Sequence, residues 1–281
     1  MIVRSRLALV AALVAGTAVA QEPQKLVLPQ PSPSATVKQT VGLTDITVEY
    51  SSPAVRGRKI WGEVVPFDEL WRAGANACTK VTLSTAASIG GKPVAAGSYC
   101  LFLLPAKTGW TFVLHKDTSL WGTDGYKPDG DVLRVPATAT TVPPRERLVF
   151  AILDFGEEGG TLALEWDTLR VGVKFEVATR AAALAAIRAL KSDDWRPYAS
   201  AARYLLDAKT EPALAIDLID RSIQLKEGWY NQWTRAQLLA AAGKPREAAA
   251  AAQRAQELGK QSKTFYLADD VAKALAEWSK K

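Results

Sequence analysis

Apolar and polar residues alternate in short runs along the first two thirds of the chain. In Thr161–Trp166, for example, Leu162, Leu164 and Trp166 share one face and Glu165 lies on the other. A period of two residues is the pattern of a half-buried β-strand. Runs of this kind, bounded by glycine, proline and other turn residues, predict strands at 35–40, 44–50, 79–83, 98–104, 111–115, 131–135, 147–155, 160–166 and 169–177.

Two connections between these runs have the composition of tight turns. Asp167-Thr168 separates the last two runs and predicts that they form a hairpin. The segment Ile89-Gly90-Gly91-Lys92-Pro93 predicts another turn. Many short strands joined by such turns are typical of an antiparallel β-sandwich or barrel-like domain, which we expect over residues 35–177.

The pattern changes to that of helices at residue 178, where Ala, Leu, Lys, Arg and Glu become dominant. At an offset of 33 residues, Leu205, Ala215 and Arg221 recur as Leu238, Ala248 and Arg254. Turns are expected at 209–212 and 243–245, and a final helix at 268–279. Residues 178–281 are therefore predicted to be an all-α tail of helical-hairpin repeats, close in period to tetratricopeptide repeats although their aromatic positions are poorly filled.

The N-terminal residues have the pattern of an export signal. Arg4 and Arg6 precede the apolar stretch 7–15, and Ala18-Val19-Ala20 matches a small-residue cleavage site. We therefore predict a signal peptide over 1–20, cleaved near Ala20, and an extended proline-containing leader over 21–34. The expected location is periplasmic or secreted, with no transmembrane segment in the mature chain.

Charge is distributed unevenly between the two predicted domains. Residues 21–177 carry sixteen basic and seventeen acidic side chains, and residues 178–281 carry seventeen basic and twelve acidic ones. A modest positive excess such as that of residues 178–281 usually reflects charged side chains on the solvent-facing sides of helices. The sequence has no cluster of basic residues interleaved with aromatic residues of the kind that nucleic-acid-binding proteins have. We therefore expect no nucleic-acid partner.

Cys78 and Cys100 are the two cysteines of the chain. Export would favour a disulfide between them, which would close a loop of about 23 residues and stabilise the fold by about 3 kcal/mol. Cys100 also lies in the apolar run 99–103, where a free thiol packs well as a small hydrophobe. The sequence leaves both alternatives open.

The amino-acid composition gives little support for a catalytic site or a metal site. One histidine and two cysteines do not make a Cys/His zinc cluster, and no motif for a nucleotide cofactor is present, so no cofactor and no resident metal are expected. His115 is predicted to point to solvent, because Trp110, Phe112 and Leu114 occupy the other face of its strand. A calcium site remains an alternative in the acidic loop that contains Asp117, Asp124, Asp129 and Asp131.

The best candidate for a ligand site is the long loop Arg56–Asn76 between two predicted strands. Its cations can pair with anions and its tryptophans can stack on rings. The alternative is that Trp61 and Trp71 pack into the core of the β-domain and that the arginines donate hydrogen bonds to carbonyl groups that hold the loop in place. The candidate ligand-binding residues are Tyr50, Arg56, Arg58, Lys59, Trp71, Arg72, Asn76 and Trp121.

Several short motifs between residues 32 and 177 resemble, in the same order along the chain, those of the bacterial domain of unknown function 2911 family. They are 41–45, 50–53, 56–62, 65–66, 70–76, 79–80, 96–99, 133–135 and 169–171. The resemblance implies an exported β-rich domain and implies no reaction, and it leaves the helical tail uncovered. Cys78 and Cys100 depart from the family's usual residues, which weakens any central role for a thiol.

These observations favour an exported, non-enzymatic binding or interaction protein. The β-domain would recognise a small cell-envelope ligand, and the helical repeats would dock an unknown protein partner. One alternative is an enzyme that acts on envelope saccharides or peptides through the Arg56–Asn76 loop. It requires Tyr50, Arg58, Arg72 and Asn76 to meet a carboxylate in one pocket. A further alternative is a purely structural component of the envelope.

Overall fold

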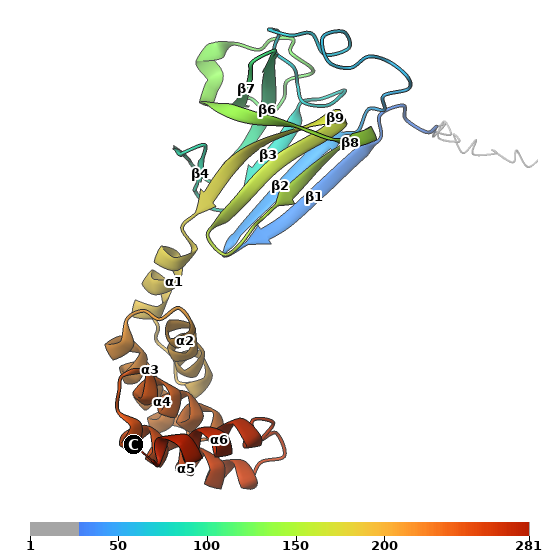
Figure 1. The fold of residues 1–281 in the computed structure, drawn as a ribbon. Helices are drawn as coiled ribbons and strands as arrows, with labels where there is room; N and C mark the ends of the chain where they lie inside the picture. Colours follow the sequence, from blue (N-terminus) through green and yellow to red (C-terminus); the bar gives the residue numbers. More distant parts are fainter. Residues whose placement is uncertain (1–27, 281) are drawn as a thin grey trace, which may run out of the picture.

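The computed structural model describes residues 28–280, so the predicted signal peptide and the first part of the leader lie outside the described residues. The chain forms a β-domain followed by a helical arm, which confirms the predicted fold class (Figure 1). The strands pair antiparallel throughout, in the order β1-β2-β3-β6-β7-β8-β9-β4-β5. They are β1 Ser34–Val41, β2 Thr44–Ser51, β3 Thr79–Leu83, β4 Ala87–Ile89, β5 Lys92–Val94, β6 Gly97–Ala106, β7 Gly109–His115, β8 Asp131–Leu153 and β9 Gly159–Val177.

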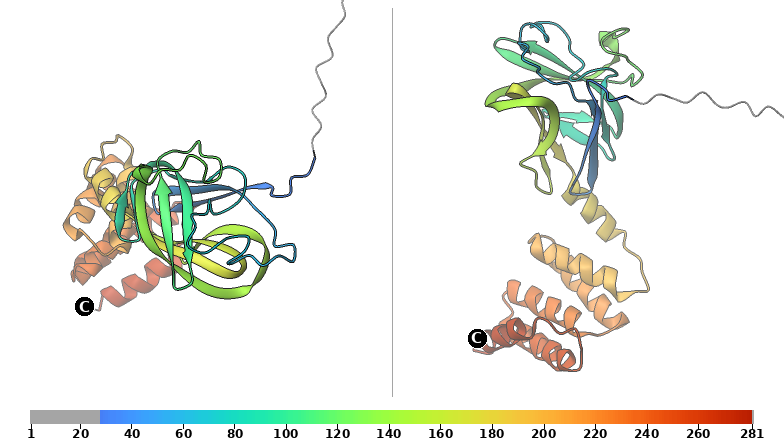
Figure 2. Two further views of the ribbon diagram at one scale, coloured as in Figure 1. Left: turned by 90° about the horizontal axis from the view of Figure 1, so that it is seen from above. Right: turned by 90° about the vertical axis from the view of Figure 1, so that its right-hand side faces the viewer.

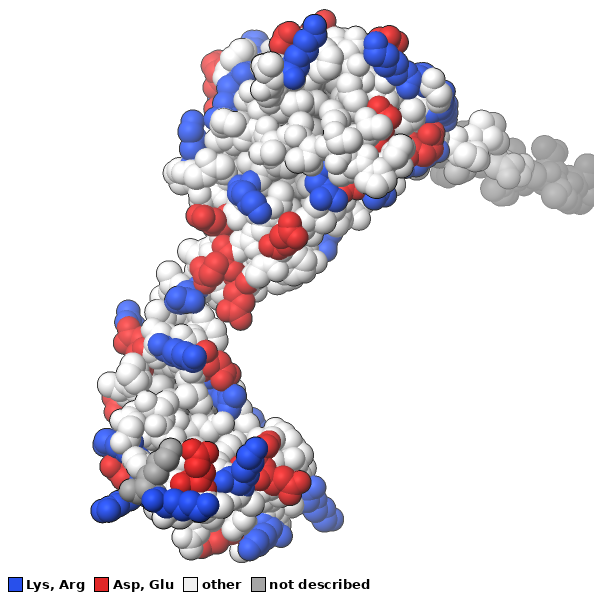
Figure 3. All heavy atoms as spheres, viewed as in Figure 1, with Lys and Arg blue, Asp and Glu red and all other residues white. Residues whose placement is uncertain are grey.

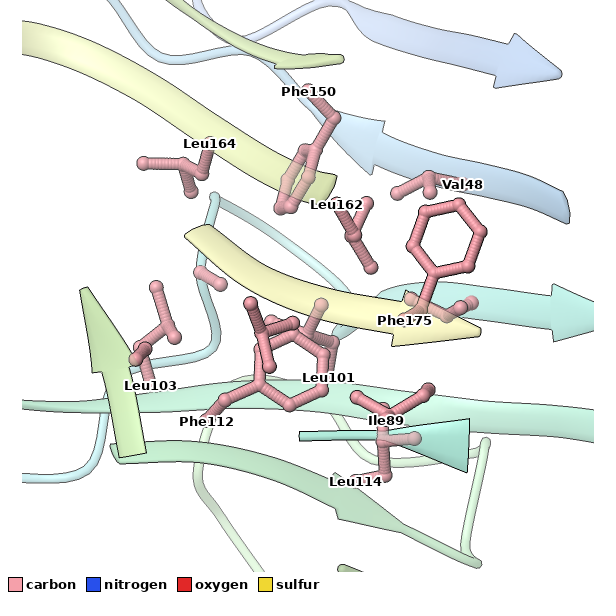
Figure 4. Packing of buried hydrophobic residues seen from close by; sticks show 14 of the residues in the cluster. Val48, Ile89, Leu101, Leu103, Phe112, Leu114, Phe150, Leu162, Leu164 and Phe175 are labelled. Carbon is pink, nitrogen blue, oxygen red and sulfur yellow. The ribbon is translucent and has the colours of Figure 1, made fainter. Parts of the chain in front are cut away.

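The sheet folds over on itself, so that β9 and the later part of β8 lie across β2, β6 and β7. Figure 4 shows side chains of both layers meeting in one core, among them Phe150 and Leu162 from one layer and Leu101 and Phe112 from the other. The apolar faces predicted from alternation are those that are buried. Burial of this continuous core is the main favourable contribution to the stability of the β-domain.

The predicted hairpin at Asp167-Thr168 is wrong, because residues 159–177 form the single strand β9. Asp167 has a positive φ of 50° and lies where the pairing of β8 with β9 shifts register. An irregularity of this kind inserts one residue and reverses the side to which the following residues point. Even-numbered residues such as Trp166 face the core before it, and odd-numbered residues such as Val171 face the core after it.

The runs 131–135 and 147–155 are likewise joined in the structure, as the continuous strand β8. Its first part pairs with β7 and its later part with β9, so one strand serves both layers. The predicted turn at Gly90-Gly91 is present, and it connects the short strands β4 and β5.

The prediction that His115 points to solvent is also wrong. Its side chain is only 4% exposed, because loop 116–130 covers the outer face of β7. Under this loop lies a second, small core with Phe102 and Leu120. Cys78 and Cys100 belong to it and form a disulfide, with their Cα atoms 5.6 Å apart. The period-two argument failed because both faces of β7 are buried.

The helical arm contains α1 Thr179–Arg188, α2 Trp195–Asp207, α3 Pro212–Leu225, α4 Trp229–Ala241, α5 Pro245–Lys260 and α6 Ala268–Trp278. The pairs α2–α3 and α4–α5 are the helical hairpins expected from the 33-residue offset. Ala215 and Ala248, which correspond at this offset, are both fully buried. Pro212 and Pro245 stand at the same offset in the first turns of α3 and α5. None of the described helices is both long and apolar enough to cross a membrane.

The two domains meet end to end through α1 (Figures 1 and 2). The Thr179 hydroxyl donates a hydrogen bond of 2.5 Å to the Glu157 carbonyl, and the Arg180 amide donates to the Glu158 carboxylate at 2.9 Å. Gly42 lies so close to Thr179 that a Cβ atom at this position would collide with it. These contacts join the β1–β2 turn, the β8–β9 turn and the start of α1.

Candidate functional site

The tryptophans of the Arg56–Asn76 loop pack into the β-domain. Trp61 lies with its ring centre 5.2 Å from Trp110 and 5.9 Å from Trp166, and Trp71 stacks on Trp166 at 5.9 Å. All four rings belong to or contact the main core. These two tryptophans therefore act as the apolar anchors of the loop.

Several polar residues of the loop are bonded to backbone carbonyl groups. Arg58 donates from Nη2 to the Ala54 carbonyl at 2.6 Å and from Nε to the Val55 carbonyl at 3.0 Å. Arg56 donates to the Pro31 carbonyl, and Asn76 to the Ser32 carbonyl, each at 3.4 Å. Arg58 therefore holds the base of its own loop, and Arg56 and Asn76 hold the end of the leader.

The remaining predicted site residues are dispersed. The Tyr50 ring packs edge-on against Phe150 at 5.0 Å, and Lys59 forms an exposed ion pair with Glu63. Arg72 lies beside Gly122, and its Nε is buried without a hydrogen-bond partner among the described residues. Trp121 is 65% exposed.

The enzyme alternative requires four of these residues to meet in one pocket. Instead they make separate contacts: Tyr50 with Phe150, Arg58 with its own loop, Arg72 with Gly122 and Asn76 with the leader. This arrangement does not favour the enzyme alternative. Ligand binding by the eight candidate residues stays a prediction.

A groove that the sequence did not indicate lies beside this loop, between β8 and β9. Its volume is about 540 Å³. Glu165 is its central charged group, with a side chain only 8% exposed. Arg145 Nε and Arg170 Nε donate to the two carboxylate oxygens of Glu165, at 2.8 and 2.6 Å. The lining residues are Val142, Pro143, Pro144, Arg145, Glu146, Arg147, Val149, Glu165 and Arg170.

The irregular backbone at Asp167 brings this cluster together. Glu165 and Arg170 are five residues apart on one strand, which in an extended strand separates two residues by about 16 Å. The positive φ of Asp167 bends β9 between them, and Arg145 pairs with Asp167 across the strands. Alternation marks Glu165 as an ordinary solvent-side residue, so no local signal in the sequence indicated the groove.

The charge of Glu165 is stabilised by its neighbours. Burial by itself would raise the pKa of the Glu165 carboxyl, but the hydrogen bonds and charges of Arg170 and Arg145 outweigh it and hold this pKa below the ordinary value of 4.5. Glu165 is therefore an ionised hydrogen-bond acceptor at neutral pH and is unsuited to act as a general acid.

The helical arm has a separate hollow of about 450 Å³, which is lined by α2, α4 and α6. Trp233 of α4 stacks on Trp278 of α6, with ring centres 5.8 Å apart, and contributes apolar surface. Charged and amide side chains from all three helices surround these rings. They are Arg203, Gln237, Asp270, Lys273 and Glu277.

The acidic loop considered for a calcium site uses two of its four carboxylates, those of Asp117 and Asp131, within the protein. Asp131 accepts hydrogen bonds from Tyr126 and Arg134, and Asp117 accepts from the amide and hydroxyl of Ser119. Between residues 28 and 280, no three His, Cys, Asp or Glu side chains gather closely enough to hold a metal ion.

Comparison with known proteins identifies the β-domain. A family model described as "Protein of unknown function (DUF2911)" matches residues 32–175, from the end of the leader almost to the end of β9. No curated protein and no solved structure matches the chain. The matched segment contains both the tryptophan-anchored loop and the arginine-lined groove and covers just over half of the sequence. The chain therefore belongs to the DUF2911 family.

Proposed function

We propose that this protein is an exported, non-enzymatic binding protein whose helical arm docks a polypeptide partner. The hollow across α2, α4 and α6 is the observation that carries the proposal. Peptide-binding surfaces combine aromatic anchors with hydrogen-bonding groups around them, and this hollow offers both. Stacked helical hairpins commonly present such a surface on one side, and a tetratricopeptide-like geometry of the arm is part of this proposal.

The polar groups around the hollow suit a peptide backbone better than a strongly charged polymer. Arg203 donates from Nη1 to the Gln237 side-chain oxygen at 2.8 Å, which orients the Gln237 amide nitrogen as a donor. Lys273 adds a cation, and Asp270 adds an anion. Figure 3 shows basic and acidic side chains interspersed over the visible face of the arm, without a single basic patch.

Two observations support export and a location in the periplasm or outside the cell. The N-terminal residues have the pattern of a cleavable signal. The Cys78–Cys100 disulfide is of the kind that persists in oxidising compartments.

The test is a matched pair of charge reversals in the full mature chain. Lys273→Glu changes the hollow, and Arg246→Glu changes an exposed position of α5 outside it. Peptides selected from a random displayed library with the wild-type protein are expected to bind Lys273→Glu at least tenfold more weakly and Arg246→Glu with unchanged affinity. Binding of these peptides should also change the tryptophan fluorescence, because Trp233 and Trp278 lie in the hollow.

Failure of the library to yield any peptide, or equal loss of binding in both variants, would refute docking in this hollow. Thermal unfolding of both variants verifies that each retains the wild-type fold.

A further inference from the structure

The groove between β8 and β9 has unused hydrogen-bond donors that face solvent. Arg145 and Arg170 each direct the Nε–Nη2 edge of the guanidinium at Glu165. Their side chains are nevertheless 47% and 41% exposed. A guanidinium carries five N–H donors, and within residues 28–280 neither arginine has a second acceptor. Each therefore has its Nη1 group available to a ligand.

The balance of charge decides what the groove accepts. Three arginines and two glutamates line it, so its net charge is +1. Glu165 is already paired with two arginines, and Glu146 accepts the Arg56 amide at 2.9 Å. A ligand group with one negative charge would bring the site to neutrality. A dianion, such as phosphate at about pH 8, would leave an uncompensated negative charge beside a buried carboxylate, which is unfavourable.

The rest of the groove is apolar. Val142, Pro143, Pro144 and Val149 form walls next to the arginines, and the volume of about 540 Å³ lies in the range of small-molecule sites. We propose that this groove binds the carboxylate of a small molecule, with Arg145 and Arg170 donating to the carboxylate and the Val and Pro side chains contacting its apolar part. Arginine is suited to this role because its planar donor edge matches a carboxylate.

The arginines are held in position for such a role. The buried Glu165 carboxylate holds Arg145 and Arg170 in place through hydrogen bonds and ion pairs. Arg147 donates from Nη1 to the carbonyls of Pro31 and Ser52 at 2.9 and 3.0 Å. A preorganised site loses less side-chain entropy when the ligand binds. This site lies on the β-domain, is separate from the hollow of the arm, and does not depend on the function proposed for the arm.

The experiment measures binding of matched probes to the full mature chain by thermal shift and calorimetry. Benzoate and its neutral analogue benzamide test the need for charge, and inorganic phosphate at about pH 8, where it is mainly a dianion, tests the preference for a monoanion. N-acetyl-dialanine and glucuronate distinguish a peptide end from a sugar acid as the source of the carboxylate. We expect at least one carboxylate probe to raise the Tm, and we expect no shift with benzamide or phosphate.

Two variants separate binding from structure. Glu165→Gln removes the internal negative charge, keeps one amide oxygen as an acceptor and raises the net charge to +2, so carboxylate affinity should rise at least tenfold and phosphate should begin to bind. The combined variant Arg145→Gln, Glu165→Gln, Arg170→Gln removes the whole cluster without leaving a buried charge unpaired, and it should bind none of the probes. Arg188→Gln with Glu211→Gln, an exposed ion pair of the arm, is the control and should bind as the wild type does.

The proposal fails if no carboxylate probe binds either the wild type or Glu165→Gln at millimolar concentration. It also fails if Glu165→Gln lowers the Tm but binds carboxylates no better. In either case the cluster is an ion-pair network that only stabilises the fold.

Discussion

At the scale of single residues, His115 and Glu165 are buried polar side chains of the β-domain that have specific hydrogen-bond partners. His115 accepts a hydrogen bond from the Asp117 amide at Nδ1 and contacts the Lys127 carbonyl through Nε2, each at 3.1 Å. This pairing selects the neutral tautomer with its proton on Nε2. Glu165 has a more costly position, because a buried carboxylate is stable only when cations compensate its lost hydration.

The stability of the protein should therefore depend on the ionisation of Glu165. Its pKa in the folded state lies below the unfolded value, so its contribution is fully present above about pH 4.5 and is lost as the pH falls through the folded pKa. Each unit of this difference corresponds to about 1.4 kcal/mol. Urea unfolding at pH 7 and pH 3 should show a larger loss of free energy of unfolding for the wild type than for Glu165→Gln.

Comparison with Glu165→Gln isolates this group, because the other carboxyls with a lowered pKa, such as Asp45 and Glu227, are present in both proteins. An identical loss in the two proteins would show that the Arg145–Glu165–Arg170 cluster contributes nothing to acid sensitivity.

At the scale of elements, a buried hydrogen-bond network joins the two helical hairpins of the arm. Asn231 of α4 is fully buried and donates to the Ser222 hydroxyl of α3 and to the Lys226 carbonyl, at 3.1 and 2.9 Å. Its side-chain oxygen accepts the Gly228 amide at 2.9 Å, so one amide satisfies three groups of the α3–α4 connection. The Ser222 hydroxyl donates in turn to the Trp195 carbonyl at the start of α2.

Asn231→Leu should destabilise the arm, because it removes the hydrogen bonds of a fully buried side chain to the Ser222 hydroxyl, the Lys226 carbonyl and the Gly228 amide. Each lost hydrogen bond costs about 1 kcal/mol, so we expect a total loss of about 3 kcal/mol in chemical unfolding monitored by far-UV circular dichroism. The control is Gln232→Ala, which loses one exposed hydrogen bond to Glu227 and should cost about 0.5 kcal/mol. Equal effects of the two substitutions would contradict a structural role for the network.

At the scale of the whole molecule, the β-domain and the arm have separate hydrophobic cores. The clusters around Phe102 and Trp166 contain residues of the β-domain only, and those around Leu205 and Trp233 contain residues of the arm only. The joint consists of a few contacts around Thr179, Glu157 and Gly42. Cores that share no residues are expected to unfold as separate cooperative units.

Calorimetry of the full chain should therefore resolve two transitions. Replacing both Cys78 and Cys100 with Ser should lower only the transition of the β-domain, by about 3 kcal/mol in free energy of unfolding. Asn231→Leu should lower only the transition of the arm. A single transition that moves as a whole with either variant would show that the two domains unfold as one unit.

The fold class follows from local patterns, whereas the groove depends on long-range geometry. Strands β2, β3 and β6 form where alternation predicted them, and the helix pairs form where the 33-residue offset placed them. The hairpin at Asp167 and the exposure of His115 were predicted wrongly, because a backbone irregularity and a covering loop override alternation. The sequence directed attention to the Arg56–Asn76 loop, whose tryptophans the structure places against the main core.

The sequence by itself determined the two kinds of domain, the apolar face of most strands and the repeat of the arm, because these depend on periodicity between residues close together in the chain. Only the tertiary structure decided that Arg145 and Arg170 meet at Glu165, and that Arg56 and Arg147 share the Pro31 carbonyl. These contacts depend on which strands lie side by side and on the bend of β9 at Asp167. The free energy of the whole fold, rather than the preference of any local segment, fixes both.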